Sequence, residues 1–287
     1  MENDISLYIP VFNGEKTIES CLESVLNQTL KPKSILVIDD NSTDKTKEIL
    51  NKYKEQIEII SNKENKGLSY SRNFAVNYLK TKYIASIDAD VVLSREWLER
   101  VLKSLLKNNA SLVGGKMYEK YINNPCNLWR SIRLKQNWGE SDILNPDLVF
   151  GCNNVLNTSN LDLRKIYNNN SEYYKLNGED TELCKFLKKK NYTLFYNSSA
   201  VCYHLQDDNY YSLANRYWRY VQYGDGFKKK NFLKILKNII RQTKKTFKWS
   251  FEDILNLRLK LLKINFVILY YFIKKDFHYF FSKEKKY

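Results

Sequence analysis

Apolar residues alternate between short runs and helical spacing over the first ninety positions. Four short, β-rich runs are present: ISLYIPVF (5–12), SILVIDD (34–40), IEII (57–60) and YIASIDAD (83–90). Between the first two runs, apolar residues recur at the spacing of a helix, from Ile18 to Leu26. This repeated alternation predicts a parallel sheet covered by helices. Ligands of such a sheet bind at the carboxyl ends of its strands.

Start signals and apolar spacing predict where further helices begin. Ser42 or Thr43 is predicted to cap the second helix. After a loop at Gly67, a helix is predicted whose inward residues are Leu68, Phe74, Ala75 and Leu79. A later helix is predicted to start at Glu179, with inward residues Leu183, Phe186 and Leu187. The run SSAVCYH (198–204) predicts a strand.

Polar residues follow the predicted strand ends. They are Asn13, Asp40, Gly67, Arg72, Asp88 and Asp90. Asp88 and Asp90 stand one residue apart and, in a strand, point to the same side. Carboxylates this close raise each other's pKa and repel unless something positive lies between them. A divalent cation would let them share a site with phosphate groups, and oxygen ligands suit Mg²⁺ or Mn²⁺.

Five segments, in order, resemble the family 2 glycosyltransferases. They are YIPVFNGEKTIESCLESVLNQTL, ILVIDDNSTDKT, NKGLSYSRN, SIDAD and NGEDTELCKFLKKKNYTLFYNSSAVCYH, within residues 5–204. The resemblance implies a GT-A-like α/β fold, with a mostly parallel sheet covered by helices, a Rossmann-like nucleotide-binding half and an acceptor half. It also implies inverting transfer of a sugar from a nucleotide-diphosphosugar with Mg²⁺ or Mn²⁺. We expect the donor to be a UDP-hexose or a UDP-N-acetylhexosamine.

By this resemblance, two strand ends bind the nucleotide base. The main chain at Pro10, Val11, Phe12 and Asn13 is expected to pack along the base. A carboxylate at a strand end can accept the uracil N3–H, and the resemblance assigns this contact to Asp40. The alternative for Asp40 is a helix cap, a role that its neighbours can also fill.

The resemblance also assigns a metal site. Asp90 is expected to be a metal ligand, Asp88 to reach the ribose or the metal, and Ala89 to complete the motif. His204 is expected to be the third metal ligand, through its neutral imidazole. The alternative for His204 is a buried, hydrogen-bonded histidine.

Three arginines are candidates for binding the donor. Arg72, which follows Gly67 near a helix start, is best explained by an anion or a base edge opposite it, because a cation at a helix N-terminus is unfavourable. The alternative is a surface pair with Glu64 or Asp44. Arg216 and Arg219 suit a diphosphate because guanidinium groups bind it bidentately, or they only line an amphipathic helix.

Inverting transfer needs a base to take the proton of the acceptor hydroxyl. Glu179 and Asp180 open a helix, where free N–H groups hold a carboxylate. The resemblance makes Asp180 the base, and Glu179 either contacts the acceptor or is a first-turn acid. The alternative for both is helix capping. The family often has a Gly-Gly-Phe turn here, whereas residues 167–180 read YNNNSEYYKLNGED, which leaves the shape of the acceptor pocket open.

Two other functions fit parts of the sequence. DADVVL (88–93) fits a metal-dependent phosphohydrolase, in which the first Asp attacks phosphate and the second is a general acid. That motif usually lies on the first strand of its domain, whereas here it lies on the fourth. A non-enzymatic basic protein that binds membrane or nucleic acid is the second alternative.

The positive charge is concentrated at the C-terminal end. Of the net charge of +15, residues 228–287 contribute +13. On a helix over 231–249, one side carries Leu233, Leu236, Ile240 and Phe247, and the other carries Lys234, Lys237, Arg241, Lys245 and Lys248. This pattern is typical of a helix that lies in a membrane surface. Alternatively, the apolar side packs on the catalytic domain or a second subunit; we expect no nucleic acid.

These features predict two regions and a cellular location. A catalytic domain is expected over 1–226, and a basic amphipathic helical extension over 227–287. The five cysteines are expected to be reduced, without a disulfide or zinc site. We expect no signal peptide, and FVILYYFI (266–273) is too short to span a bilayer. The chain is therefore expected in the cytoplasm, peripheral at the inner face of the cell membrane, with a lipid-linked glycan acceptor.

Overall fold

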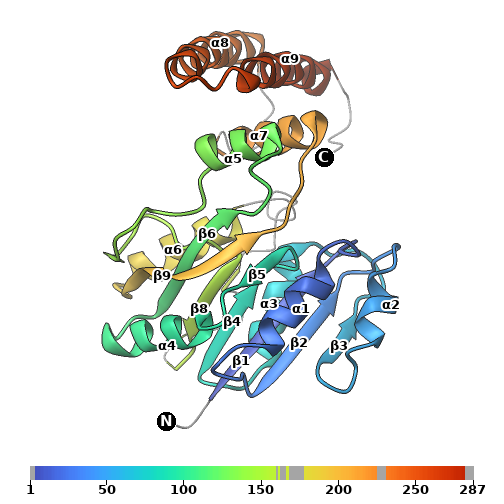
Figure 1. Cartoon of the computed structure of the whole chain (residues 1–287), viewed down its shortest axis with the longest axis vertical. Coiled ribbons are helices and arrows are strands. Elements are labelled where there is room, and N and C mark those ends of the chain that lie inside the picture. The colour runs from blue at the N-terminus through green and yellow to red at the C-terminus, as the bar shows by residue number, and fades with distance from the viewer. Residues whose placement is uncertain (1–3, 160, 162–165, 168–177, 225–230, 282–287) are drawn as a thin grey trace. The chain divides into compact units, whose positions relative to one another are not determined.

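The computed structural model describes residues 4–159, 161, 166–167, 178–224 and 231–281 (Figure 1). The chain divides into two compact units, which are described separately. The first unit comprises Met1–Lys120 and Lys135–Gln206, and the second comprises Tyr121–Leu134 and Asp207–Tyr287. The predicted boundary between 226 and 227 lies outside the described residues. The second unit differs from the predicted extension because it also includes segments that precede this boundary.

Within the described residues, the first unit is built on a nine-stranded sheet with the order β3-β2-β1-β4-β8-β6-β9-β5, in which β7 also pairs with β9. Its elements are β1 (Ile5–Val11), α1 (Ile18–Leu26), β2 (Ser34–Asp39), α2 (Thr46–Asn51), β3 (Glu58–Ser61), α3 (Leu68–Tyr78), β4 (Tyr83–Ile87), β5 (Val91–Leu93), α4 (Trp97–Lys107), β6 (Leu112–Glu119), β7 (Ile143–Leu144), β8 (Asn153–Asn157), α6 (Glu179–Lys189) and β9 (Leu194–His204).

The sheet has a parallel half and a mixed half. The four strands predicted from the first ninety residues pair in parallel, in the order β3-β2-β1-β4. In the other half, β8 runs antiparallel to β4 and β6, whereas β6 and β9 are parallel. The predicted fold class, a mostly parallel α/β sheet with helices on it and a helical C-terminal part, is confirmed.

Apolar side chains fill both faces of the parallel half. Along β1, Leu7 and Ile9 pack in the core that includes α1 and α4, whereas Tyr8 packs in the core that includes α3 and α6. A strand covered on both faces needs a mostly apolar sequence, which explains the run at 5–12, where Ser6 is the one small polar residue. All five cysteines are buried, and their thiols are free.

Three details of the predicted helices are wrong. The second helix begins at Thr46, where Asp44 accepts a hydrogen bond from the Thr46 N–H, because Ser42 instead accepts one from the backbone of Asn13. In α3, Leu68 and Phe74 are only half-buried, while the helix buries Ser69, Ser71, Arg72 and Asn73. In α6, Phe186 is exposed, and Cys184 takes the buried position.

The second unit is helical in its described residues. Its helices are α5 (Pro125–Arg133), α7 (Tyr210–Gly224), α8 (Phe232–Leu255) and α9 (Lys260–Phe281). They enclose an apolar core that includes Trp129, Leu213, Tyr217, Ile264 and Phe272. The helix predicted over 231–249 is confirmed as part of α8. Neither α8, α9 nor any other described helix is long and apolar enough to cross a bilayer.

Candidate active site

The paired acids Asp88 and Asp90 lie where β4 leaves the sheet and β5 begins. Each carboxylate has its own cationic partner. Asp88 Oδ1 lies 2.7 Å from Nη2 of Arg72, and Asp90 Oδ2 lies 3.1 Å from Nε2 of His204. Burial raises the pKa of the Asp88 carboxyl, the Arg72 guanidinium opposes this rise, and the Asp90 carboxylate adds to it. These separate partners therefore reduce the repulsion between the Asp88 and Asp90 carboxylates.

Arg72 connects the paired acids to the start of α6. Its Nη1 lies 2.9 Å from Oε1 of Glu179, while its Nη2 holds Asp88. The anion expected opposite Arg72 is thus supplied by two protein carboxylates. The alternative of a surface pair with Glu64 or Asp44 is wrong, because the Arg72 side chain is only 1% exposed. Contact between Arg72 and a nucleotide stays a prediction.

Gly151 supports both Arg72 and Asp180 from the loop before β8. A Cβ at position 151 would lie 2.0 Å from Nη1 of Arg72, so only glycine leaves room for the guanidinium there. The Gly151 N–H donates to Oδ2 of Asp180 at 3.2 Å. One backbone position therefore fixes the place of the buried cation and orients the predicted base.

The two acids that open α6 have different surroundings. Glu179 is buried against Arg72, and this burial raises the pKa of Glu179 to about 7. The Arg72 guanidinium lowers the pKa and the Asp180 carboxylate raises it further. Asp180 is only partly buried, and its Oδ1 accepts a hydrogen bond from the Thr181 N–H at 2.7 Å. Of the two, Asp180 is the carboxylate more open to an incoming hydroxyl group. Its role as the base stays a prediction.

His204 is held between two carboxylates at the end of β9. It is opposite Val91 on one neighbouring strand and opposite Glu119 on the other. Its Nε2 faces Asp90, and its Nδ1 lies 3.1 Å from Oε2 of Glu119. Burial disfavours the imidazolium, but the Asp90 and Glu119 carboxylates outweigh burial and raise the pKa of His204 to about 9. His204 is therefore buried and hydrogen-bonded, which was the alternative to a metal ligand. The same arrangement is compatible with metal binding.

The donor set around His204 fits a divalent cation. A metal-binding histidine commonly has its second ring nitrogen held by a carboxylate, and Glu119 holds Nδ1 in this way. Nε2 is left facing Asp90, an oxygen ligand suited to Mg²⁺ or Mn²⁺. Within the described residues, no group of three His, Cys, Asp or Glu side chains is close enough to hold a metal alone. The remaining ligands would then come from phosphate and water, as is usual for Mg²⁺.

Asp40 is fixed by a loop and is not a helix cap. Its Oδ1 accepts hydrogen bonds from Asn62 Nδ2 at 2.7 Å and from the Lys66 N–H at 2.9 Å. Its Oδ2 accepts one from the Gly67 N–H at 2.7 Å. A carboxylate offers about four acceptor positions, so these three bonds leave about one for a further donor. The expected uracil contact of Asp40 stays a prediction.

The segment from Pro10 to Asn13 runs from strand to loop beside the end of β2. Pro10 and Val11 pair with that strand, and Phe12 is half-exposed. Asn13 adopts a left-handed conformation (φ +53°), and its side chain accepts a hydrogen bond from the Thr43 N–H at 2.8 Å. The loop after β1 and the loop after β2 are therefore hydrogen-bonded to each other next to Asp40. Packing of this segment against a base stays a prediction.

Arg216 and Arg219 lie on α7 in the second unit. Arg216 Nε lies 3.6 Å from Oδ2 of the buried Asp208, which also pairs with Arg130. Burial and the neighbouring Arg216 both lower the pKa of the Arg219 guanidinium. Both side chains are partly buried, and Trp218, which lies between them in the sequence, belongs to the core. Their contact with a diphosphate stays a prediction.

Glu119 and Gly151 were not predicted from the sequence as site residues. Glu119 ends the run LVGGKMYE (112–119), so it carried the same signal as Asp40: an acid at the end of a strand. Only the pairing of β6 with β9 reveals that Glu119 faces His204. Gly151 had no comparable signal, because its role depends on a guanidinium from a distant helix. The predicted departure from the family pattern, at residues 168–177, lies outside the described residues.

A family model described as "Glycosyl transferase family 2" matches residues 6–161. Among curated relatives, the UDP-Glc:alpha-D-GlcNAc-diphosphoundecaprenol beta-1,3-glucosyltransferase WfgD of Escherichia coli is 36% identical over 121 residues, 42% of this chain and 47% of that protein. The poly(ribitol-phosphate) beta-glucosyltransferase of Bacillus spizizenii is 36% identical over 39% of this chain and 19% of its own length. The chain thus spans less than half of either relative.

Solved structures resemble the fold. The mannosyltransferase PcManGT from Pyrobaculum calidifontis, solved with GDP-Man and Mn²⁺, has a TM-score of 0.57 and 17% identity, covering 75% of this chain and 61% of that one. TarS residues 1–349 of S. aureus, solved with UDP, has a TM-score of 0.55 and 18% identity, covering 76% of this chain and 65% of that one. At this identity the likeness shows a common fold alone.

Proposed function

This chain belongs to glycosyl transferase family 2, and we propose that it transfers a sugar from a nucleotide-diphosphosugar to a glycan acceptor with inversion. One observation carries the proposal. Asp88 of the paired acids and Glu179 at the start of α6 both contact a single buried guanidinium, that of Arg72, and Asp180 directly follows Glu179 in the chain. A donor-binding motif and a candidate base therefore lie at one site, as a direct displacement requires. No comparable observation favours a phosphohydrolase or a non-enzymatic basic protein.

The proposed reaction is a single displacement. The acceptor oxygen bonds to the anomeric carbon while the bond from that carbon to the diphosphate oxygen breaks, and the nucleoside diphosphate leaves. Asp180 takes the proton of the acceptor hydroxyl. Hydrogen bonds from the N–H groups of Gly151 and Thr181 support this role, because they orient the carboxylate before the acceptor arrives. Glu179 remains bound to Arg72 and positions the start of the helix.

The proposed donor is a UDP-hexose or a UDP-N-acetylhexosamine. Asp40 keeps about one acceptor position for the uracil N3–H, and this observation supports uracil over cytosine. The E. coli relative is named for UDP-Glc, and the TarS structure contains UDP. We propose that Asp90 and His204, together with oxygen atoms of the diphosphate, would hold Mg²⁺ or Mn²⁺, and that Asp88 reaches the ribose or the metal. The bound cation would neutralise the negative charge of the diphosphate leaving group.

The proposed acceptor is a lipid-linked glycan. The name of the E. coli relative includes a diphosphoundecaprenol-linked sugar, which supports an acceptor of this class. Such an acceptor would require contact with a membrane, and we propose that the C-terminal helices provide it at the cytoplasmic face. Contact with a second subunit through the same helices is the alternative.

Donor turnover tests the proposal. The full chain is incubated with Mn²⁺ and single nucleotide sugars, with and without lipid-linked saccharides, and products are identified by mass spectrometry. We expect release of UDP and a product enlarged by one sugar. Release of inorganic phosphate from monoesters, with no sugar transferred to any acceptor, would instead favour the phosphohydrolase.

A further inference from the structure

The helix α8 exposes its apolar side and buries a polar one. Its buried residues are Ile235, Asn238, Gln242, Thr246, Ser250 and Asp253. The exposed large apolar residues of α8 are Phe232, Leu233, Leu236, Ile240, Phe247, Phe251, Ile254 and Leu255, and we call this set the apolar stripe. Water-facing helices normally show the opposite arrangement.

Specific contacts hold the polar side of α8 in place. The Tyr217 hydroxyl donates to Oε1 of Gln242 at 2.6 Å. The side-chain amide of Asn265 donates to Oδ2 of Asp253 at 2.9 Å, and Arg133 pairs with Asp253 at 2.9 Å. Turning the helix to hide its apolar stripe would leave the Gln242 carbonyl and the Asp253 carboxylate without these partners. The exposed stripe is therefore a property of how this unit packs.

The apolar surface continues beyond α8. The rings of Phe247 and Phe266 are 6.1 Å apart, so the stripe meets exposed residues of α9, which include Tyr270. At the turn between the helices, Leu257 is 86% exposed and adopts a left-handed conformation (φ +55°). This conformation is costly for a leucine, and strain of this kind accumulates at functional positions.

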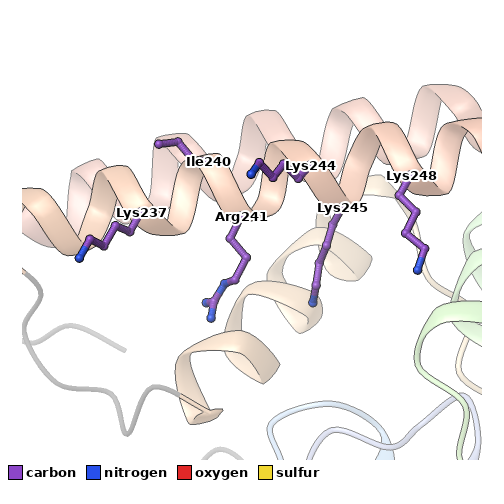
Figure 2. A pocket seen from close by; sticks show the side chains of 6 residues that line it. All are labelled: Lys237, Ile240, Arg241, Lys244, Lys245 and Lys248. Carbon is purple, nitrogen blue, oxygen red and sulfur yellow. The ribbon is translucent and has the colours of Figure 1, made fainter.

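A row of cations lies beside the apolar stripe. Lys237, Arg241, Lys244, Lys245 and Lys248 line a shallow groove of about 460 Å³, together with Ile240 (Figure 2). In Figure 2 the side chains of Lys237, Arg241, Lys245 and Lys248 extend from one side of the helix, while Ile240 points away from them. Residues 231–251 contain no Asp or Glu, so no acidic side chain in this stretch offsets the row.

We propose that the apolar stripe and the adjacent cations are a docking surface for an anionic lipid bilayer, with α8 lying in the plane of the interface. An anionic bilayer offers acyl chains to the stripe and phosphate groups to the cations at the same depth. A second copy of the chain, docked stripe to stripe, would bring two rows of like charge together. Nucleic acid would match the cations but leave the stripe in water.

The biological role of this docking surface rests on the proposed function, because binding to a bilayer would bring the enzyme to a lipid-linked acceptor. Vesicle binding and donor turnover are nevertheless separate properties. Loss of turnover with intact vesicle binding would count against the glycosyltransferase proposal alone. Loss of vesicle binding with intact turnover would count against the docking surface alone.

The test is co-sedimentation of the full chain with vesicles of phosphatidylcholine, with or without phosphatidylglycerol. We expect binding to the anionic vesicles that weakens with salt, and much weaker binding to neutral ones. Lys237→Gln with Lys244→Gln should weaken binding by about 30-fold, because each lysine near an anionic surface contributes about fivefold. Ile240→Ser with Phe251→Ser should weaken it by at least tenfold, because two exposed apolar anchors are lost.

Matched controls come from the first unit. Lys54→Gln with Lys63→Gln removes the same charge from exposed positions, and Leu144→Ser removes an exposed apolar side chain. Both should bind vesicles like the wild type. Circular dichroism and donor turnover verify that every variant is folded. Equal binding by stripe and control variants, or no binding by the wild type, would overturn the proposal. A dimer in light scattering that dissociates only in the stripe variants would assign the stripe to a second copy.

Discussion

Arg72 and its carboxylates are the residue-scale feature on which the site depends. A single buried guanidinium contacts Asp88 and Glu179, and the Asp180 carboxylate lies close enough to influence Glu179. Asp88 and Glu179 are each bound to this guanidinium, whereas Asp180 accepts hydrogen bonds from the N–H groups of Gly151 and Thr181. Asp180 is therefore the proposed acceptor of the proton.

Asp180→Asn should abolish most transfer and leave donor binding intact. Asparagine keeps the size of the side chain but cannot take a proton, and loss of a general base costs about 10²–10⁴ in rate. The turnover number is measured with saturating donor, and the UDP dissociation constant by calorimetry. Glu182→Gln, a partly exposed acid of the same helix paired with Lys185, is the control. Turnover of the Asn variant within a few-fold of wild type would assign the base to another group.

Glu179 should make stability depend on pH between about 4.5 and 7. Burial raises its pKa to about 7 in the folded protein, so the folded state binds more protons than the unfolded state in this window. Its contribution to stability is complete below the unfolded pKa of about 4.3 and is lost as the pH rises through 7. Glu179→Gln removes this dependence.

Urea denaturation at a series of pH values measures the effect. From pH 4.5 to 7, the wild type should lose up to about 3 kcal/mol of unfolding free energy relative to Glu179→Gln. The Glu182→Gln protein should follow the wild type over the same range. If the curves of Glu179→Gln and the wild type run parallel, the carboxyl group of Glu179 titrates near its ordinary pKa.

At the scale of single elements, α8 is held by buried polar contacts as well as by the apolar contacts of Ile235 and Trp249. Its contacts with the other helices of the second unit include the hydrogen bond from the Tyr217 hydroxyl to Gln242. Sequence periodicity located the apolar side of this helix and favoured a membrane surface for it, with packing on protein as the alternative. The partners of the polar side, such as Asn265 and Arg133, come from other helices and have no local signal.

Tyr217→Phe should therefore destabilise the second unit. The substitution keeps the ring in its apolar core but leaves the buried Gln242 carbonyl without its donor, which costs about 1–3 kcal/mol. Chemical denaturation followed by tryptophan fluorescence reports the change, because Trp129 and Trp249 pack on the Tyr217 ring. Tyr220→Phe, which removes an exposed hydroxyl from the same helix, should change the unfolding free energy by much less. Equal effects would mean that the buried bond contributes nothing.

At the scale of the whole molecule, the sequence predicted elements better than contacts. The parallel strands and the acids at their ends followed from alternation and spacing alone. The pairing of Arg72 with Glu179, 107 positions away, did not, because no local pattern records which distant carboxylate a buried guanidinium meets. Glu119 was missed for the same reason. The helix start at Thr46 was misjudged because Ser42 bonds to another loop.

Metal and donor should bind together and stabilise the chain. EDTA should abolish transfer, and Mn²⁺ or Mg²⁺ should restore it, because the proposed metal site needs phosphate oxygens as well as Asp90 and His204. At a concentration 100-fold above the dissociation constant, UDP with Mn²⁺ should stabilise the protein by about 2.7 kcal/mol. Thermal unfolding measures this, with UDP alone and Mn²⁺ alone as controls. Full turnover after thorough chelation would exclude a metal role.

The strand β9 also determines when the site can form during synthesis. Asp90 leaves the ribosome 114 positions before His204, its partner on that strand. At typical bacterial or eukaryotic rates of about 5–20 residues per second, the interval is roughly 6 to 23 s. During this interval, the nascent chain contains Asp88 and Asp90 but lacks His204. It also lacks β9, the strand that pairs with β5 and β6. The unpaired edges of those strands can then pair with other chains, so translation pauses before residue 194 should increase aggregation of this protein.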